Sequence, residues 1–229
     1  MSRSRTTSEA FLLAGVGGCV DAVGVITLGG LFVSHMSGNT AALGALFGQG
    51  HWAAGWPHLF AIPIFVIGLF GGYWWAGCGV SLRRCAAIFF LEAGLLAAFG
   101  VGMVVFDSPS PGQGLYFLLA CLPLLAMGLQ NATLRQIGRS EFPSTYVTGV
   151  LDRLAQNCAE YVRDRGTPQG REALVRAGAA LSMWTSYAIG AVVGGTGLLV
   201  LDKAFLMLPV FLLLGLGFRL WKLDRPPVG

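Results

Sequence analysis

Asp21 is the side chain with the clearest potential for chemistry, because it is an acid inside a long apolar run. In a helix that spans a bilayer, an acid costs ~2.5–3.5 kcal/mol on insertion scales and usually faces a partner or a water-filled cavity. Gly17 and Gly24, at i−4 and i+3, leave a shallow face on which another backbone can approach closely. Asp21 is therefore expected either to bind a solute or ion, or to hydrogen-bond a broken stretch of backbone.

A second polar group interrupts the apolar run at residues 31–47, where Ser37, Gly38, Asn39 and Thr40 follow one another. Three polar side chains around a glycine suit irregular backbone at membrane depth, which is tolerated only where protein or a cavity surrounds it. A polar contact between two helices is the alternative. Two histidines, His35 and His58, have no other typical metal ligands near them in the sequence. They are interpreted as hydrogen-bonding residues.

The chain contains an internal repeat that links these groups to a second set of polar residues. Residues 18–22 align with 128–132 at an offset of 110, since 128 − 18 and 131 − 21 agree, and residues 34–38 align with 145–149 at 111. Gly68 and Gly72 match Gly190 and Gly194 at 122. The increase of the offset from 111 to 122 falls where the second half has a longer polar loop than the first. One membrane domain, 1–229, is thus predicted to hold two copies, 10–106 and 115–221.

The repeat places Gln130 and Asn131 opposite Asp21, and it places Tyr146 and Thr148 opposite the first polar string. Isolated polar groups in hydrocarbon each cost several kcal/mol, so the two sets are most cheaply satisfied by each other near the bilayer midplane. The predicted solute- or ion-binding residues are Asp21, Ser37, Asn39, Thr40, Gln130, Asn131, Tyr146 and Thr148.

The amino-acid composition is typical of an integral membrane protein. Hydrophobic residues make up 55% of the 229, charged residues only 11%, and the mean hydropathy is +0.68; a soluble domain has roughly 25% charged residues. The net charge of +4 does not point to nucleic acid, because the basic residues sit in short loops. We predict an all-α integral membrane protein with about six transmembrane helices, at 10–28, 58–80, 85–106, 115–134, 174–200 and 204–221. Two irregular or re-entrant elements, 31–47 and the amphipathic 144–162, complete it.

The basic residues predict the topology. If residues 31–47 crossed the bilayer, Arg83 and Arg84 would lie opposite Arg3 and Arg5, against the positive-inside rule. If that element enters and returns, all basic loops share the cytoplasmic side with both termini. Three crossings per copy then place the two halves in opposite orientations, as in the inverted repeats of many transporters and channels.

Other reactive residues give weaker signals. Glu92 lies inside its span and is expected to pair with a basic residue such as Arg135 or Arg176. The five cysteines have no CxxC spacing and are interpreted as small buried hydrophobic residues. We expect no metal, no cofactor and no catalytic residue.

Several motifs together resemble the YoaK-like DUF1275 family of bacterial inner-membrane proteins. The residues that carry the resemblance are 18–21, 29–40, 127–132 and 145–149, and it covers most of the chain. It implies a multi-spanning inner-membrane protein of uncharacterised function, so no substrate can be transferred. It does mark the segments around Asp21, Asn39 and Asn131 as signature positions.

The predicted function is a small transporter or channel for a small solute, with its polar site between the repeats. A membrane scaffold or sensor that moves nothing is the alternative, and an intramembrane hydrolase is a weaker one, because no GxSG motif or second intramembrane aspartate is present. The expected partners are the lipid bilayer and a small molecule or ion, not nucleic acid. Substrate, coupling ion and oligomeric state, including a homo-oligomer, remain open.

Overall fold

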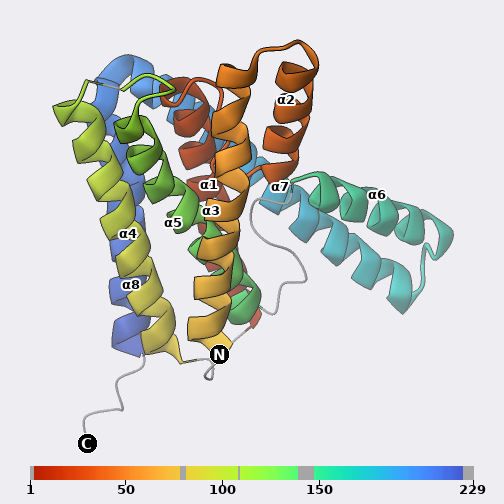
Figure 1. Cartoon of the computed structure of the whole chain (residues 1–229). Helices are drawn as coiled ribbons and strands as arrows, with labels where there is room; N and C mark the ends of the chain where they lie inside the picture. Colours follow the sequence, from red (N-terminus) through yellow and green to blue (C-terminus); the bar gives the residue numbers. More distant parts are fainter. Residues whose placement is uncertain (1–2, 78–80, 108, 139–146, 224–229) are drawn as a thin grey trace, which may run out of the picture.

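The computed structural model describes residues 3–77, 81–107, 109–138 and 147–223, with side chains for 8–75, 81–107, 109–133 and 147–223. Regular structure in these residues is entirely helical, which confirms the all-α prediction (Figure 1). The elements are α1 (Arg3–Thr27), α2 (Met36–Gly48), α3 (Trp52–Gly77), α4 (Leu82–Val105), α5 (Gly114–Gly138), α6 (Val147–Arg163), α7 (Pro168–Leu201), the 3₁₀ turn η1 (Asp202–Leu206) and α8 (Met207–Leu223).

Five helical stretches of the described chain are long and apolar enough to cross a bilayer. They are Ser8–Thr27, Trp52–Trp75, Leu82–Val105, Gly114–Thr133 and Pro168–Leu223, the last of which contains α7, η1 and α8. A spanning helix needs ~20 apolar residues, and each stretch reaches that length. The chain is therefore a multi-pass membrane protein. Helix α1 begins and α8 ends at the same end of the bundle (Figure 1).

The segment between α1 and α3 reverses direction inside the bundle. Gly29 and Gly30 have φ values of +66° and +92°, which a side chain would disfavour, and they turn the chain back after α1. Residues 31–35 then run beside α1, and α2 returns toward the end at which α1 stopped (Figure 1). The predicted irregular element is thus a turn, a non-helical stretch and a short helix.

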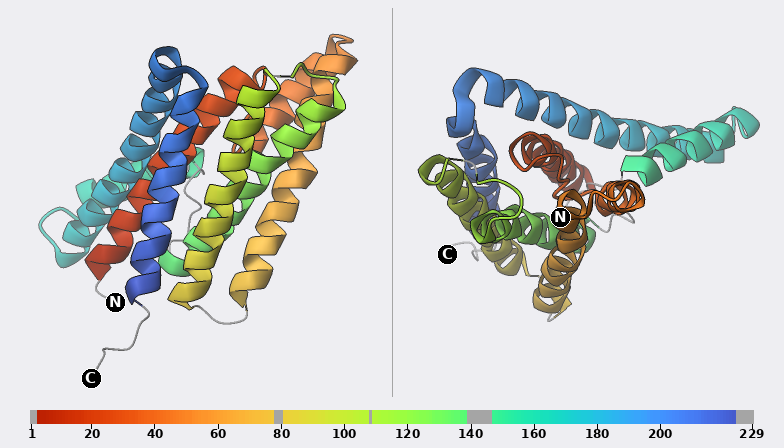
Figure 2. Two further views of the ribbon diagram at one scale, coloured as in Figure 1. Left: turned by 90° about the vertical axis from the view of Figure 1, so that its left-hand side faces the viewer. Right: turned by 45° about the horizontal axis from the view of Figure 1, so that its top comes forward.

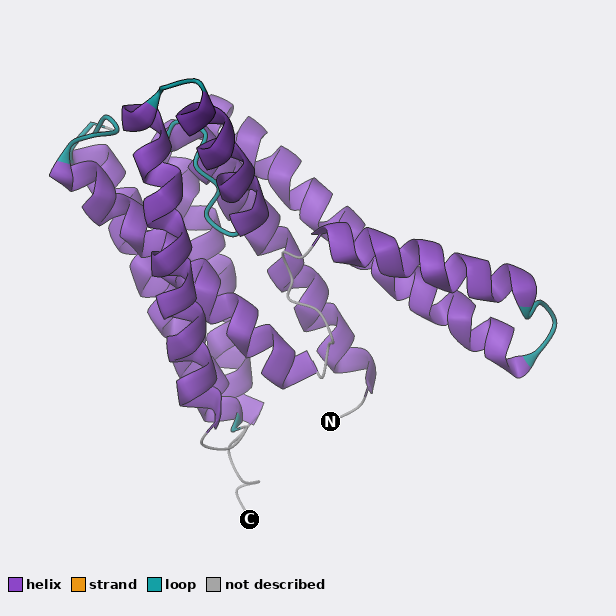
Figure 3. Ribbon diagram, turned by 45° about the vertical axis from the view of Figure 1, so that its right-hand side comes forward, coloured by secondary structure: helices purple, strands orange, loops and turns teal. Residues whose placement is uncertain are grey.

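The helices pack in pairs that join distant parts of the sequence. Helix α1 lies along α7, α3 lies along α5, and α4 contacts both α5 and α8 (Figure 2). Helix α2 packs on α3, and α6 packs on the first part of α7. The α6–α7 hairpin projects away from the bundle (Figure 3).

Glycines bring the paired helices together, among them Gly68, Gly72, Gly190 and Gly194. A Cβ atom on Gly190 of α7 would overlap the carbonyl oxygen of Gly15 on α1. A Cβ on Gly68 of α3 would lie 2.6 Å from the carbonyl oxygen of Leu125 on α5. Only glycine allows the backbones to approach so closely in these two pairs.

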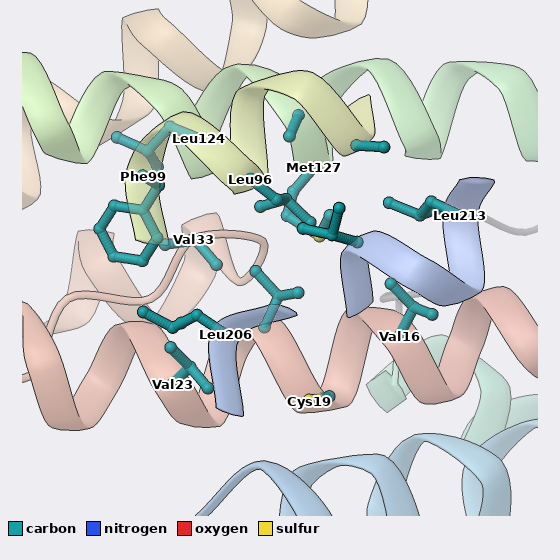
Figure 4. Packing of buried hydrophobic residues seen from close by; sticks show 14 of the residues in the cluster. Val16, Cys19, Val23, Val33, Leu96, Phe99, Leu124, Met127, Leu206 and Leu213 are labelled. Atoms are coloured by element: carbon teal, nitrogen blue, oxygen red, sulfur yellow. The ribbon is translucent and has the colours of Figure 1, made fainter. Parts of the chain in front are cut away.

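The apolar core lies where α1, α4, α5 and η1 meet. Val23, Phe99 and Leu206 come from three of these elements and point toward one another, and Val33 of the irregular segment lies beside them (Figure 4). Val33 is fully buried. The irregular segment is therefore part of the core and not a surface loop.

Helix α3 begins earlier than the predicted span at 58–80. It starts at Trp52 and includes Trp56, so only residues 49–51 separate it from α2. Pro57 lies near the start of α3, where a missing backbone N–H removes little hydrogen bonding. The last element begins with the 3₁₀ turn η1 before α8.

Candidate functional site

The Asp21 carboxylate is the centre of a dense hydrogen-bond group. Its Oδ1 accepts from the backbone N–H groups of Val33 at 3.0 Å and Ser34 at 2.8 Å. Its Oδ2 accepts from the Ser34 hydroxyl, from His35 Nδ1 at 2.7 Å and from the Tyr187 hydroxyl at 2.8 Å. Asp21 itself is only 2% exposed. We call Asp21, Ser34, His35 and Tyr187 the Asp21 group.

The Asp21 group joins three elements. Asp21 lies on α1, Ser34 and His35 lie on the irregular segment, and Tyr187 lies on α7. The backbone N–H groups of Val33 and Ser34 confirm that Asp21 hydrogen-bonds a broken stretch of backbone. Its binding of a solute or ion stays a prediction.

His35 is a partly exposed member of this group, as is Tyr187. Its side chain is 23% exposed, whereas that of Asp21 is 3% exposed. Its Nδ1 faces Asp21, and its ring meets the Tyr187 ring edge-on with centroids 5.3 Å apart. A histidine held by a carboxylate through Nδ1 has a fixed ring orientation and a second nitrogen for other partners. The arrangement suits transfer of a proton between a buried acid and the outside.

Asn39 makes a second group, with His58, next to the first. Its amide pairs both ways with the Phe32 backbone, accepting from Phe32 N at 3.1 Å and donating to Phe32 O at 2.7 Å. Its Oδ1 also lies 3.0 Å from His58 Nδ1 on α3, and Nδ2 lies 3.7 Å from the Met36 sulfur. Protein contacts use the whole amide, so Asn39 positions the irregular segment against α3. Its binding of a solute stays a prediction.

The other predicted residues lie elsewhere. Ser37 and Thr40 are exposed on α2, and Thr148, the repeat counterpart of Ser37, is exposed on α6. Tyr146 lies outside the described residues. None of the three exposed hydroxyls is hydrogen-bonded to Asp21; Thr40 donates to Met36 O at 2.8 Å. We therefore do not place Ser37, Thr40 or Thr148 in the Asp21 group.

Gln130 and Asn131 are buried in α5. Gln130 Nε2 donates to the carbonyl oxygen of Leu13 at 2.9 Å, which ties α5 to α1. Leu13 lies eight residues before Asp21, about 12 Å along the helix axis. Gln130 thus bonds to α1 at a different depth from the Asp21 carboxylate, and the predicted convergence of the two does not occur in this conformation.

The expected pairing of Glu92 with Arg176 is wrong. Arg176 of α7 donates to Asn157 at 2.9 Å and to Glu160 at 2.8 Å, both on α6. Arg176 bonds to α6 because α6 and the first part of α7 pack together in the projecting hairpin. Glu92 lies instead in the core of the bundle. The other suggested partner, Arg135, has a side chain outside the described set.

Sequence reasoning missed Tyr187 and gave His35, His58 and Ser34 no role in a site. One signal was available: Tyr187 aligns with Phe65 at the offset of 122, so the second copy carries a hydroxyl where the first has none. Tyr187 lies on α7, and α7 packs against α1, the helix that holds Asp21.

Two cavities border the core without reaching these groups. A groove of about 260 Å³ lies between α1, α7 and α8; its lining includes Val16, Cys19, Ile189 and Leu212. A void of about 10 Å³ lies between α1, α4, η1 and the start of α8. Neither is lined by Asp21 or Asn39.

A family model described as "Protein of unknown function (DUF1275)" matches residues 10–218, almost the whole membrane domain. The chain belongs to this DUF1275 family. The match includes the Asp21 group and Asn39, so the resemblance inferred from the motifs is confirmed.

A curated relative of this DUF1275 chain is the UPF0700 transmembrane protein YoaK of Bacillus subtilis (strain 168). It is 26% identical over 149 residues, and the alignment covers 64% of this chain and 64% of the relative. The chain thus aligns with less than two thirds of YoaK's length. No solved structure matches the chain.

Proposed function

We propose that this DUF1275 protein is a small-solute transporter or channel of the bacterial inner membrane and not an enzyme. It has six crossings, α1, α3, α4, α5, α7 and α8, with both termini in the cytoplasm. The halves 10–106 and 115–221 form an inverted repeat. The observation that carries the proposal is the Asp21 group, which links a buried acid, a partly exposed histidine and an irregular segment of one half to Tyr187 of the other.

Helix pairing supports the repeat. Exchanging α1 with α5, α2 with α6, α3 with α7 and α4 with α8 maps the observed pairs onto one another: α1–α7 becomes α5–α3, and α2–α3 becomes α6–α7. In Figure 1, α1 and α5 run in opposite directions, as an axis in the membrane plane requires.

Individual contacts support it at residue level. Gly190 faces Gly15, and Gly68 faces Leu125; the offsets are 190 − 68 = 122 and 125 − 15 = 110, the same as in the sequence alignment. Likewise, Gly194 faces Cys19 and Gly72 faces Leu129, again at 122 and 110. Equivalent residues therefore make equivalent contacts in the two halves.

The position of the Asp21 group supports transport over the alternatives. Irregular backbone at membrane depth, with ionisable side chains, is typical of transporter sites between repeats. A scaffold or sensor needs no partly exposed histidine there. A hydrolase would need a nucleophile at the free nitrogen of His35, but the Ser34 hydroxyl lies 3.4 Å from Nδ1, on the side of Asp21.

The topology can be tested with Cys158. The expectation that the cysteines are buried fails here, because Cys158 is exposed on α6. A variant with alanine at Cys19, Cys78, Cys85 and Cys121 should react with a membrane-impermeant maleimide in inverted vesicles but not in spheroplasts.

The same background with Asp107→Cys provides the opposite control, since Asp107 lies between α4 and α5 and is exposed. It should gain labelling in spheroplasts. Labelling of Cys158 from the spheroplast exterior would contradict cytoplasmic placement of α6 and would remove the charge argument for six crossings.

Transport itself can be tested in proteoliposomes that enclose a pH-sensitive dye. A panel of amino acids, organic acids, amines, sugars and metal salts is added outside, and we expect at least one class to drive proton movement through the wild type. His35→Gln should reduce that flux by roughly 10²-fold, because a positioned proton-transfer group contributes at least that much.

His51→Gln is the matched control, since His51 is an exposed histidine between α2 and α3, and it should behave as the wild type. If wild-type vesicles respond to the panel no differently from empty vesicles, the scaffold or sensor alternative is favoured. Equal flux through wild type and His35→Gln would remove His35 from the mechanism.

A further inference from the structure

Glu92 is a buried acid that the Asp21 group does not use. Its side chain is 0% exposed, in the middle of α4. Neither carboxyl oxygen has a hydrogen-bond partner within the described part of the chain. Buried polar groups in proteins almost always have partners, so an exception with an ionisable side chain calls for a functional explanation.

The position of Glu92 follows from the helix register. It lies on the same face of α4 as Leu96 and Phe99, which line the small void together with Val20 and Val23 of α1. Phe99 points toward Val23 (Figure 4), and these two residues are each seven residues beyond Glu92 and Val16, so Glu92 and Val16 lie at similar depth. Gln130 of α5 bonds to Leu13 O. Glu92 therefore faces the centre of the bundle, about 7.5 Å along α1 from the level of Asp21.

No described cation can neutralise a carboxylate at this place. The described ionisable side chains on the elements around α4 are Tyr116 and Cys121 of α5, Arg219 and Lys222 of α8, Asp202 and Lys203 of η1, His58 and Tyr73 of α3, and Glu9, Cys19 and Asp21 of α1. On α4 itself, Arg83, Arg84 and Cys85 lie near its start, seven or more residues before Glu92, and Arg83 lies over the Trp221 ring. The basic ones are engaged or lie near helix ends: Arg219 approaches Glu9 of α1, and Lys203 pairs with Asp107.

An uncompensated carboxylate in such surroundings is far more costly than a neutral acid. An alkali cation is a poor alternative, since it needs several oxygen ligands and space, and neither described cavity is lined by Glu92. A proton needs neither several oxygen ligands nor a cavity. It forms a bond to one carboxyl oxygen and leaves no net charge.

We propose that Glu92 is a proton-binding site in the core of the bundle, separate from the Asp21 group, occupied in this conformation and emptied when water reaches α4. Release of the proton requires α4 to separate from a neighbour, because the packed core offers no base to receive it. The site thus couples one proton to the packing of α4, independently of whether the chain carries a solute.

Infrared spectroscopy of the purified protein tests this without transport. At about pH 8, far above the ordinary value for glutamic acid of ~4.3, the wild type should show the C=O stretch of a protonated carboxylic acid. Glu92→Gln should lack that band, and Asp21→Asn should keep it. A wild-type spectrum with no band sensitive to Glu92→Gln would overturn the proposal.

Thermal unfolding in detergent gives a second readout. Unfolding exposes the carboxyl to water, where it releases its proton above about pH 4, so the wild type should lose stability relative to Glu92→Gln as the pH rises. The two should melt alike near pH 5 and separate by about pH 8. Glu172→Gln, at a carboxyl that is 77% exposed, should retain the wild-type dependence.

Identical pH profiles for wild type and Glu92→Gln would show that Glu92 is ionised in the folded protein, against the proposal. If Glu92→Gln does not fold, Glu92→Asp takes its place in the infrared experiment. It keeps an acid and should shift the protonated-carboxyl band, whereas an unshifted band belongs to another residue and contradicts the assignment.

Discussion

Gly190→Ala is expected to be among the most destabilising single substitutions in this protein. The added methyl group would overlap the carbonyl oxygen of Gly15, and a backbone atom cannot rotate away as a side chain can. Helices α1 and α7 would have to separate, at a cost of about 1–3 kcal/mol or more. Tyr187, one turn away, would also move from Asp21. The measurement is the melting temperature in detergent, together with the yield of monodisperse protein.

Gly178→Ala is the matched control on the same helix. Its Cβ would meet nothing within 4 Å, and alanine is a better helix former than glycine by about 1 kcal/mol. It should melt at or above the wild-type temperature. Gly68→Ala, the repeat counterpart of Gly190→Ala, should cause a loss of similar size. A Gly190→Ala protein as stable as Gly178→Ala would disprove the tight α1–α7 contact.

Asp21→Ala and Asp21→Asn are expected to separate the structural role of Asp21 from its proposed role in proton transfer. Alanine leaves the backbone N–H groups of Val33 and Ser34 without their acceptor, and a buried unsatisfied donor costs about 1–3 kcal/mol. Asparagine keeps an oxygen for these donors, and its amide can donate to the hydroxyls of Ser34 and Tyr187. Asp21→Ala should therefore melt well below the wild type, and Asp21→Asn close to it.

Solute uptake tests the proposed role of Asp21 in proton transfer. Asp21→Asn cannot carry a proton, so the pH-dependent part of any solute uptake should disappear although the protein remains folded. Asn39→Ala tests the adjoining group in the same assay. If both variants take up a solute that the wild type moves, with an unchanged pH profile, the two groups are packing contacts and the site assignment fails.

The sequence predicted the elements well because membrane spans are long and their composition is extreme. The charge pattern also predicted the reversal at residues 31–47, since only a returning segment keeps Arg83 and Arg84 on the side of the N-terminus. The start of α3 was missed, because tryptophans suited to an interface and Pro57 look like loop residues although they fit the first turns of a helix.

The candidate site was predicted only in part, because its contacts are not local. Asp21 and Asn39 stand out as polar residues in apolar runs. Tyr187 is 166 residues from Asp21, and a lone tyrosine in a span gives no reason to connect it with a particular acid. Glu92 shows the opposite error: its expected partner Arg176 bonds to α6 instead.

The pairing of α1 with α7 has a consequence for biosynthesis. Residues 28–167 are made between these two helices, which takes roughly 7–28 s at ~5–20 residues per second. During that time the glycine face of α1 and the side chain of Asp21 are in the membrane without α7. The first half of the chain, inserted alone, lacks the helix against which α1 packs, and the second half lacks the partner of α5. Each half thus completes the folding of the other, so the ribosome must finish most of the protein before either half can assemble.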